Sequence, residues 1–137
     1  MVGIVIVSHS AKVAEGICEM AAQMARAEQK ILAAGGTADG GIGTDASLVA
    51  ERIVQADVGE GVLILADLGS AVLSAETALE FLDEKLRKRV QIADAPILEG
   101  AISAAVEASL GSSLASVVAT AEGARDLHKL SAEKRRT

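Results

Sequence analysis

Two short, uninterrupted apolar runs constrain the fold of this chain more than any other feature of its sequence. Residues 2–7 (VGIVIV) and 61–66 (GVLILA) contain no charged or strongly polar side chain and are rich in Val, Ile and Leu. Such runs are typical of central parallel strands that are covered on both faces. Weaker strand candidates lie near 30–35 and 89–95. The chain therefore predicts a sheet with four strands.

Apolar residues recur at helical intervals between the strand candidates. The stripe that predicts a helix after the first strand consists of Val13, Ile17, Met20 and Met24. The stripe that predicts one helix after the third strand consists of Val72, Ala75, Leu79, Leu82 and Leu86. Another helix is predicted to begin at Thr44 or Asp45, either of which can cap its first turn. Its inward-facing residues are expected to be Val49, Ile53 and Ala56. After Pro96, two further helices are predicted at about 97–110 and 113–128.

This order of elements alternates strands and helices. Such alternation is typical of an α/β fold, with an open, mainly parallel sheet, right-handed crossovers and helices on both faces. In a four-stranded sheet of order 2-1-3-4, strands one and three are neighbours. Residues 1–130 are predicted to form a single domain, and residues 131–137 a charged tail.

Polar residues directly follow the two best strand candidates. Ser8, His9 and Ser10 follow the first run, and Asp67 follows the second. Ligands of such sheets bind outside the carboxyl ends of the strands, where the strand order reverses. With the order 2-1-3-4, this rule predicts that His9 and Asp67 lie side by side. A carboxylate at Nδ1 would fix the tautomer of the ring and leave Nε2 as a neutral nucleophile.

The surroundings of His9 favour a phosphoryl group as the species that this nitrogen attacks. Backbone N–H groups of the following helix and the hydroxyls of Ser8 and Ser10 would favour an anion. The glycine-rich segment 35–45 falls at the same edge of the sheet and can add backbone amides and the hydroxyls of Thr37 and Thr44. The alternative is that His9 is an ordinary cap or loop residue.

Composition and charge disfavour other partners and cofactors. The formal net charge is −6 and Phe81 is the only aromatic residue, so nucleic acid is not expected to bind. No apolar run approaches the about 18 residues that cross a bilayer, and the first residues do not resemble a signal peptide. We expect a cytoplasmic protein without a membrane partner.

No metal or other cofactor is predicted. The two histidines, His9 and His128, lie far apart, and the single cysteine, Cys18, is expected to be a small buried side chain. The glycine-rich segment matches neither a Walker A sequence nor a dinucleotide fingerprint. His128 is expected to be a solvated residue at a helix end.

Four segments taken together resemble one family. They are VIVSHSAKVAEG (5–16), GGTADGGIGT (35–44), GVLILADLGSA (61–71) and DAPILEGAISAAV (94–106). The chain resembles, from residue 2 to about residue 125, the phosphotransfer subunits of phosphoenolpyruvate-dependent dihydroxyacetone kinases. These are related to the mannose-type enzyme IIA domains of the bacterial sugar phosphotransferase system.

The resemblance implies a sheet of order 2-1-3-4, a homodimer, and a histidine that accepts phosphate from the carrier protein HPr. It assigns that histidine to His9 and the carboxylate that opens DLGS to Asp67. It also implies that the glycine-rich loop lines the same cleft with Thr37, Gly41, Gly43 and Thr44. The family then passes the phosphoryl group to ADP on the nucleotide-binding kinase subunit. Since the chain stops at Thr137, we expect its phosphoryl donor to be a separate protein.

Three functional interpretations remain open. We prefer a relay to kinase-bound ADP, because DLGSA and EGA resemble the dihydroxyacetone branch. The second is a mannose-type enzyme IIA that passes phosphate to a sugar-transporter IIB protein. The third is a non-catalytic regulatory module, in which phosphorylation of His9 only changes its partners.

Two surfaces are predicted to contact other proteins. Leu68, Ser70 and Val72 follow Asp67 at the exposed end of the third strand and are expected to dock the partner. Small apolar residues of the last two helices are expected to offer a dimer surface. These are Ala101, Ile102, Ala105, Val106, Val117, Val118 and Ala121.

Overall fold

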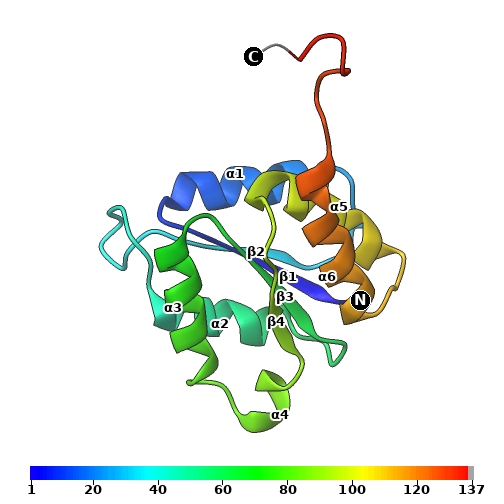
Figure 1. Ribbon diagram of the computed structural model, residues 1–137. Coiled ribbons are helices and arrows are strands. Elements are labelled where there is room, and N and C mark those ends of the chain that lie inside the picture. Colours follow the sequence, from blue (N-terminus) through cyan, green and yellow to red (C-terminus); the bar gives the residue numbers. More distant parts are fainter. Residues whose placement is uncertain (136–137) are drawn as a thin grey trace.

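A parallel sheet lies between two layers of helices in the computed structural model, which describes residues 1–135 (Figure 1). The strands are β1 (Gly3–Ser8), β2 (Ile31–Gly35), β3 (Val62–Ala66) and β4 (Val90–Ile92). The helices are α1 (Ala11–Ala22), α2 (Ala46–Ala56), α3 (Gly69–Leu79), α4 (Glu84–Arg87), α5 (Ile97–Ser109), α6 (Leu114–Gly123) and the 3-10 helix η1 (Ala124–Asp126). All strand pairs are parallel and the order is β2-β1-β3-β4, which confirms the predicted α/β fold and sheet order.

Alternate residues of β1 face the two helical layers. Ile4 and Ile6 belong to the core beneath α1, α5 and α6, whereas Val5 and Val7 belong to the core against α2 and α3. All four side chains are fully buried. Because both faces of the strand are covered, its sequence is apolar without alternation.

The buried face of α1 differs from the predicted stripe, which is wrong except for Ile17. The side chains that α1 buries are Ala14, Ile17 and Ala21. Val13 and Met20 are about half exposed, at 46% and 50%, and Met24 lies beyond the end of the helix. Close approach explains the difference, since a Cβ at Gly35 of β2 would lie 2.9 Å from the Cβ of Ala14. At this point of closest approach, only a small side chain such as that of Ala14 fits between α1 and β2.

The single helix predicted after the third strand is two helices. α3 ends at Leu79, and α4 begins at Glu84 after a turn. Asp83 caps α4 by accepting a hydrogen bond from the Leu86 N–H at 2.8 Å, which favours a new helix start at this point. Leu82 and Leu86 are buried as expected but belong to the turn and to α4, and the side chains that α3 buries are Ala71, Ala75 and Ala78.

The remaining elements agree closely with the predicted ranges, with shorter ends. β4 has only three residues instead of the predicted run 89–95, and α6 ends at Gly123 instead of continuing to residue 128. Asp45 is the cap of α2, accepting hydrogen bonds from two backbone N–H groups of the first turn. His128 is exposed and lies beyond η1 in the C-terminal segment, which extends away from the sheet (Figure 1). The last two residues of the predicted tail, 136–137, lie outside the described part of the chain.

The small residues that were expected to form a dimer surface lie mostly in the core. Those that are buried between α5, α6 and the sheet are Ala101, Ala105, Val117, Val118 and Ala121. Ile102 is half-buried and Val106 is 39% exposed. These helices use their small side chains to pack against each other, so this expected surface is wrong.

Side chains also secure the edges of the sheet. Arg52 of α2 reaches the outer edge of β2, where its Nε donates to the Ala33 carbonyl at 3.0 Å. Asp57, at the end of α2, pairs with Arg89, which immediately precedes β4; the distance from Nη2 to Oδ2 is 2.6 Å.

Cys18 is half-buried. Its burial, and to a lesser extent the charge of Glu15, raise the pKa of its thiol to about 11. Within residues 1–135, no helix has the length and hydrophobicity needed to traverse a bilayer.

Candidate active site

The register of the two central strands brings His9 and Asp67 together. Val7 is the partner of Ala66 in the β1–β3 ladder, and the Asp67 N–H donates to the Val7 carbonyl at 3.1 Å. The residues that follow, His9 and Asp67, therefore emerge at one edge of the sheet, as the strand order predicts. The Nδ1 atom of His9 lies 2.9 Å from Oδ1 of Asp67.

The Asp67 carboxylate accepts hydrogen bonds on both oxygens. Its Oδ2 accepts from the His9 backbone N–H at 3.0 Å and from the Ser8 hydroxyl at 2.9 Å, while Oδ1 faces the His9 ring. Partial burial acts to raise the pKa of Asp67, but the hydrogen bonds from His9 and Ser8 outweigh it, so the pKa of Asp67 lies below its usual value. An ionised carboxylate can only accept, so it favours a proton on the facing ring nitrogen.

The other ring nitrogen points outward, towards α3. Nε2 of His9 lies 2.6 Å from the Ser70 hydroxyl, in the first turn of that helix. The side chain of His9 is 23% exposed and that of Asp67 is 18% exposed. Asp67 thus fixes the ring at Nδ1, while part of the ring stays accessible to solvent, as an attacking nucleophile requires.

Neither serine beside His9 has a hydroxyl that faces the open cleft freely. Ser8 is only 1% exposed; besides donating to Asp67, its oxygen accepts the Ser10 N–H at 3.1 Å. The Ser10 hydroxyl caps α1 by accepting the Val13 N–H at 3.2 Å. The Ser8 hydroxyl lies beneath the ring and is not available to line a phosphate site, in contrast to the expectation from the sequence.

The glycine-rich loop contacts His9 through one backbone group. The Gly43 N–H donates to the His9 carbonyl at 2.8 Å, and Gly43 has a φ of +144°. The Thr37 hydroxyl stays within the loop, where its oxygen accepts the Gly41 N–H at 2.9 Å. Thr44 bonds to the hydroxyl of Ser74 on α3. Through these hydrogen bonds the loop links the end of β1 to α3, and its threonine hydroxyls are engaged within the protein.

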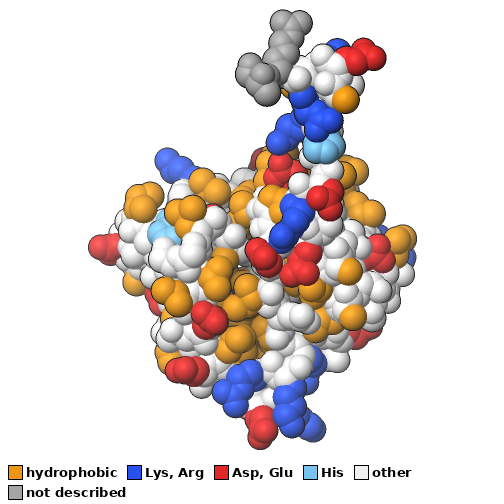
Figure 2. Space-filling model, viewed as in Figure 1, with side chains coloured by type: hydrophobic (Ala, Val, Ile, Leu, Met, Phe, Trp, Pro, Cys, Tyr) orange, Lys and Arg blue, Asp and Glu red, His pale blue; other side chains and the backbone are white. Residues whose placement is uncertain are grey.

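A cleft of about 510 Å³ opens beside Asp67, between α3 and the end of β4. Leu68 and Val72, two of the residues expected to dock a partner, line it, and Leu68 is 62% exposed. Glu76 and Asp94 add carboxylates to its wall. Figure 2 shows hydrophobic side chains gathered in the hollow between α3 and β4. The cleft is apolar with an acidic rim.

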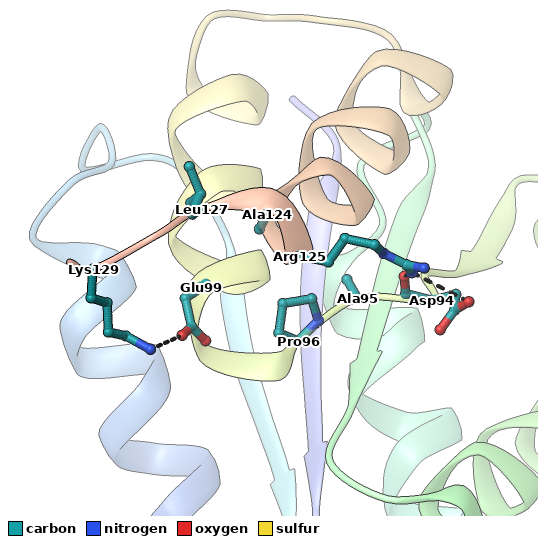
Figure 3. A pocket seen from close by; sticks show the side chains of 8 residues that line it. All are labelled: Asp94, Ala95, Pro96, Glu99, Ala124, Arg125, Leu127 and Lys129. Atoms are coloured by element: carbon teal, nitrogen blue, oxygen red, sulfur yellow. Dashed lines mark hydrogen bonds and ion pairs between the residues drawn. The ribbon is translucent and has the colours of Figure 1, made fainter. Parts of the chain in front are cut away.

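A second pocket, of about 540 Å³, lies where the C-terminal segment crosses the start of α5 (Figure 3). Its charged side chains pair with each other: Lys129 with Glu99 at 2.9 Å, and Arg125 with Asp94 at 3.3 Å. These pairs hold the segment against α5. The pocket includes neither His9 nor Asp67, and we assign it no chemical role.

Two of the contacts that the sequence did not predict involve serines of α3. One is the Ser70 hydroxyl on Nε2, and the other is the bond from Ser74 to Thr44. The sequence did offer one signal for the Ser70 contact. Ser70 comes three residues after Asp67, and a helix that begins directly after the strand places its first turn beside the end of that strand. Among residues 1–135, no three His, Cys, Asp or Glu side chains gather as in a metal centre.

The fold and the site together define a class of protein: a doubly wound α/β domain that presents an oriented histidine where its strand order reverses. Residues 3–118 match a family model, EIIA-man, described as the PTS system fructose IIA component. The chain belongs to this family.

Individual proteins to which the chain is similar share one name, DhaM. The chain is 48% identical over 107 residues to the phosphoryl donor subunit DhaM of PEP-dependent dihydroxyacetone kinase 2 of Listeria innocua, covering 78% of this chain and 86% of that protein. It is 41% identical over 137 residues to the corresponding DhaM subunit of Escherichia coli; this match covers 98% of the chain but only 28% of the relative. The resemblance to the dihydroxyacetone kinase branch is thereby confirmed.

Solved structures show the same fold. EF1359, a protein of unknown function with a crystal structure, is 42% identical in sequence to this chain. The two structures superpose with a TM-score of 0.81, over 90% of this chain and 95% of that one. The enzyme IIA component of the phosphotransferase system of Streptococcus agalactiae has a TM-score of 0.65 at 16% identity, which shows the fold alone.

Proposed function

We propose that this chain is the phosphohistidine relay subunit of a phosphoenolpyruvate-dependent dihydroxyacetone kinase. One observation carries the proposal: Asp67 holds Nδ1 of His9 at 2.9 Å, while Nε2 lies 2.6 Å from the Ser70 hydroxyl on a ring that is 23% exposed. The names of the relatives in Listeria innocua and Escherichia coli support the same role. The protein would act in the cytoplasm, where the phosphoryl donor HPr is available.

The relay needs two displacements at phosphorus. In the first, the lone pair of Nε2 attacks the phosphoryl group of phosphorylated HPr, and a nitrogen–phosphorus bond forms as the bond from phosphorus to HPr breaks with its electron pair. In the second, a β-phosphate oxygen of ADP attacks, and the electron pair of the nitrogen–phosphorus bond returns to Nε2. Asp67 offsets the positive charge on the ring while phosphorus is attached. The ATP formed would then phosphorylate dihydroxyacetone on a further subunit.

The acceptor is expected to bring the positive charge that transfer requires. The side chains that contact the His9 ring are a carboxylate and a hydroxyl, and the adjoining cleft adds Glu76 and Asp94. Phosphoryl transfer depends on positioning and on cations that stabilise the charge on the moving group. ADP with Mg²⁺ on the kinase subunit fits this requirement, and free ADP does not.

Leu68, Ser70 and Val72 are the proposed docking surface for this partner, since Leu68 and Val72 line the cleft beside Asp67 and the Ser70 hydroxyl contacts Nε2 of His9. A homodimer also remains part of the proposal. Leu73 and Phe81 on the α3 side of the molecule are 64% and 59% exposed, and they are candidates to be covered by a second copy. A monomeric mass at micromolar concentration in analytical ultracentrifugation would exclude the dimer.

The experiment that tests the proposal is reconstitution with ³²P-phosphoenolpyruvate, enzyme I and HPr. We expect label on the wild-type protein and on His128→Ala, which removes the only other histidine, but none on His9→Ala. The linkage should be labile in acid and stable in alkali, as in phosphoramidates. Label on His9→Ala, or an acid-stable phosphoserine at Ser8 or Ser10, would contradict the assignment.

The same labelled protein distinguishes the possible acceptors. We expect it to lose its label to ADP when the nucleotide-binding kinase subunit is present, and hardly at all to free ADP. The description of the matching family as a fructose IIA component favours one second candidate, transfer to a sugar-transporter IIB protein. Transfer to a IIB protein but not to the kinase complex would establish that candidate. Label that leaves to neither would point to the regulatory module.

A further inference from the structure

We propose that Ser8 is a positioning residue, which acts through Asp67 to set the tautomer and the orientation of the His9 ring. Its hydroxyl is 1% exposed and bridges the start of α1 to the Asp67 carboxylate. The consequence for phosphoryl transfer rests on the proposed function of His9. The consequence for the ring itself does not, and can be measured without any transfer.

The direction of each hydrogen bond follows from one backbone group. The Ser10 N–H can only donate, and it points at the Ser8 oxygen at 3.1 Å. Asp67, held ionised, can only accept, and its Oδ2 lies 2.9 Å from the same hydroxyl. The Ser8 hydroxyl therefore accepts from Ser10 and must place its own proton on Asp67.

This proton is one of two that hold Oδ2 in place. The other comes from the His9 backbone N–H at 3.0 Å, from a different direction. With Oδ2 occupied by both, the plane of the carboxylate is fixed and Oδ1 is presented to the ring at 2.9 Å from Nδ1. Because Oδ1 only accepts, the neutral ring carries its proton on Nδ1.

The chain of directions ends at the reacting atom. With the proton on Nδ1, Nε2 carries the lone pair, and the Ser70 hydroxyl at 2.6 Å must donate to it. When phosphorus takes its place on Nε2, this hydrogen bond breaks and Ser70 keeps its proton. The Ser10 N–H thus sets the direction of each following hydrogen bond, through the side chains of Ser8, Asp67 and His9, as far as Nε2.

Burial makes the Ser8 hydroxyl hard to replace. An exposed carboxylate that loses one donor recruits water, but Oδ2 faces a hydroxyl that is itself shielded from solvent. Without it, the carboxylate is held by the His9 N–H alone and can turn away from Nδ1. The proposed docking residues Leu68 and Val72 do not contact Ser8, so partner affinity should stay unchanged while the transfer step slows.

The test compares Ser8→Ala and Ser8→Thr with the wild type. Ser109→Ala is a matched control, because Ser109 is also a buried serine, accepting the Arg26 N–H at 3.0 Å, but belongs to the far end of α5. ¹⁵N chemical shifts and ring couplings at alkaline pH report which nitrogen of His9 carries the proton. We expect the Nδ1–H tautomer in the wild type, Ser8→Thr and Ser109→Ala, and a mixture of both tautomers in Ser8→Ala.

Transfer from phosphorylated HPr provides the second readout. We expect the rate constant at saturating HPr to fall about tenfold in Ser8→Ala, with an unchanged KM for HPr, and to recover in Ser8→Thr. A wild-type ring with its proton on Nε2, or a Ser8→Ala ring with the wild-type tautomer, would overturn the proposal. If Ser8→Ala fails to fold, a wild-type ring with its proton on Nε2 would still overturn the proposal. Failure of HPr to phosphorylate wild-type His9 would overturn the proposed function and leave the tautomer measurement intact.

Discussion

Asp67 is the residue at which the hydrogen bonds of the site converge. It receives two from His9, one from the backbone and one from the ring, and one from Ser8. These donors outweigh the effect of burial and lower the pKa of its carboxyl group. The site therefore holds a negative charge at neutral pH beside the ring that is proposed to carry the phosphoryl group.

Replacing Asp67 by asparagine tests the value of that charge. We expect Asp67→Asn to keep the fold, since the amide has the same shape, and to slow phosphoryl transfer by about 10²-fold to 10⁴-fold. The amide can present its NH₂ group to Nδ1 and so favour the wrong tautomer. Rapid-quench labelling measures the rate, with Asp126→Asn, an exposed carboxylate in η1, as the control. Unchanged kinetics would leave Asp67 with a structural role only.

At the scale of elements, the contact between α1 and β2 depends on the absence of a side chain. A Cβ at Gly35 would lie 2.6 Å from the Ser10 carbonyl and 2.9 Å from the Ala11 Cα. These atoms are backbone at the start of α1, directly after His9. The position of His9, the proposed nucleophile, thus depends on how closely this helix approaches the second strand.

We expect Gly35→Ala to lower the free energy of unfolding by about 1–3 kcal/mol, because α1 must move to relieve the overlap. Transfer from HPr should slow with it. Gly16→Ala is the matched control: a methyl there meets open space in the middle of the same helix, so it should stabilise the protein by about 0.5–1 kcal/mol. Urea denaturation measures both. Equal effects of the two substitutions would exclude close packing as the cause.

The start of α2 provides a second test of an element. Asp45 accepts hydrogen bonds from the Ser47 N–H at 3.0 Å and the Leu48 N–H at 3.3 Å. Asp45→Ala should cost about 1 kcal/mol in urea denaturation, and Asp45→Asn should retain most of that stability. A full loss in Asp45→Asn would show that charge, rather than the cap hydrogen bonds, is what matters.

The strands were more predictable from the sequence than the helix faces. Continuous apolar runs identify central strands, and the strand order then brings His9 and Asp67 together. The face of α1 was misjudged because hydropathy ranks Val13 and Met20 above alanine, whereas the close approach of α1 to β2 requires a small side chain at Ala14. The contact from Ser70 to Nε2 depends on the exact residue at which α3 begins, and composition and periodicity do not determine that residue.

At the scale of the whole molecule, one ion pair joins segments that lie far apart in the chain. Asp57 ends α2 and Arg89 precedes β4, and their distance is 2.6 Å. The hydrogen bond from Arg89 is the main cause that lowers the pKa of Asp57. Because the folded pKa lies below the unfolded value of about 3.9, the pair contributes its full stability above that value. The contribution is lost as the pH falls through the folded pKa.

We therefore expect Asp57→Asn to be less stable than the wild type near pH 7, and the difference between the two to shrink as the pH falls below about 4. Chemical denaturation across this range measures it. A double-mutant cycle with Arg89→Gln supplies the control, since its coupling energy should vanish over the same pH interval. A difference that stays constant with pH would mean that the carboxylate charge of Asp57 is not what stabilises the fold.

The alanines that line α1, α3 and α5 also determine how the folded state tolerates change. An alanine has no side-chain rotamers to lose when it is buried, so these interfaces form with little loss of conformational entropy. The same property removes any means of adjustment, because a methyl group cannot rotate away from an added methylene. Enlarging a buried residue such as Ala75 or Ala104 therefore has to move a whole helix, and a shift of α3, which carries Ala75, also displaces the Ser70 hydroxyl from Nε2 of His9.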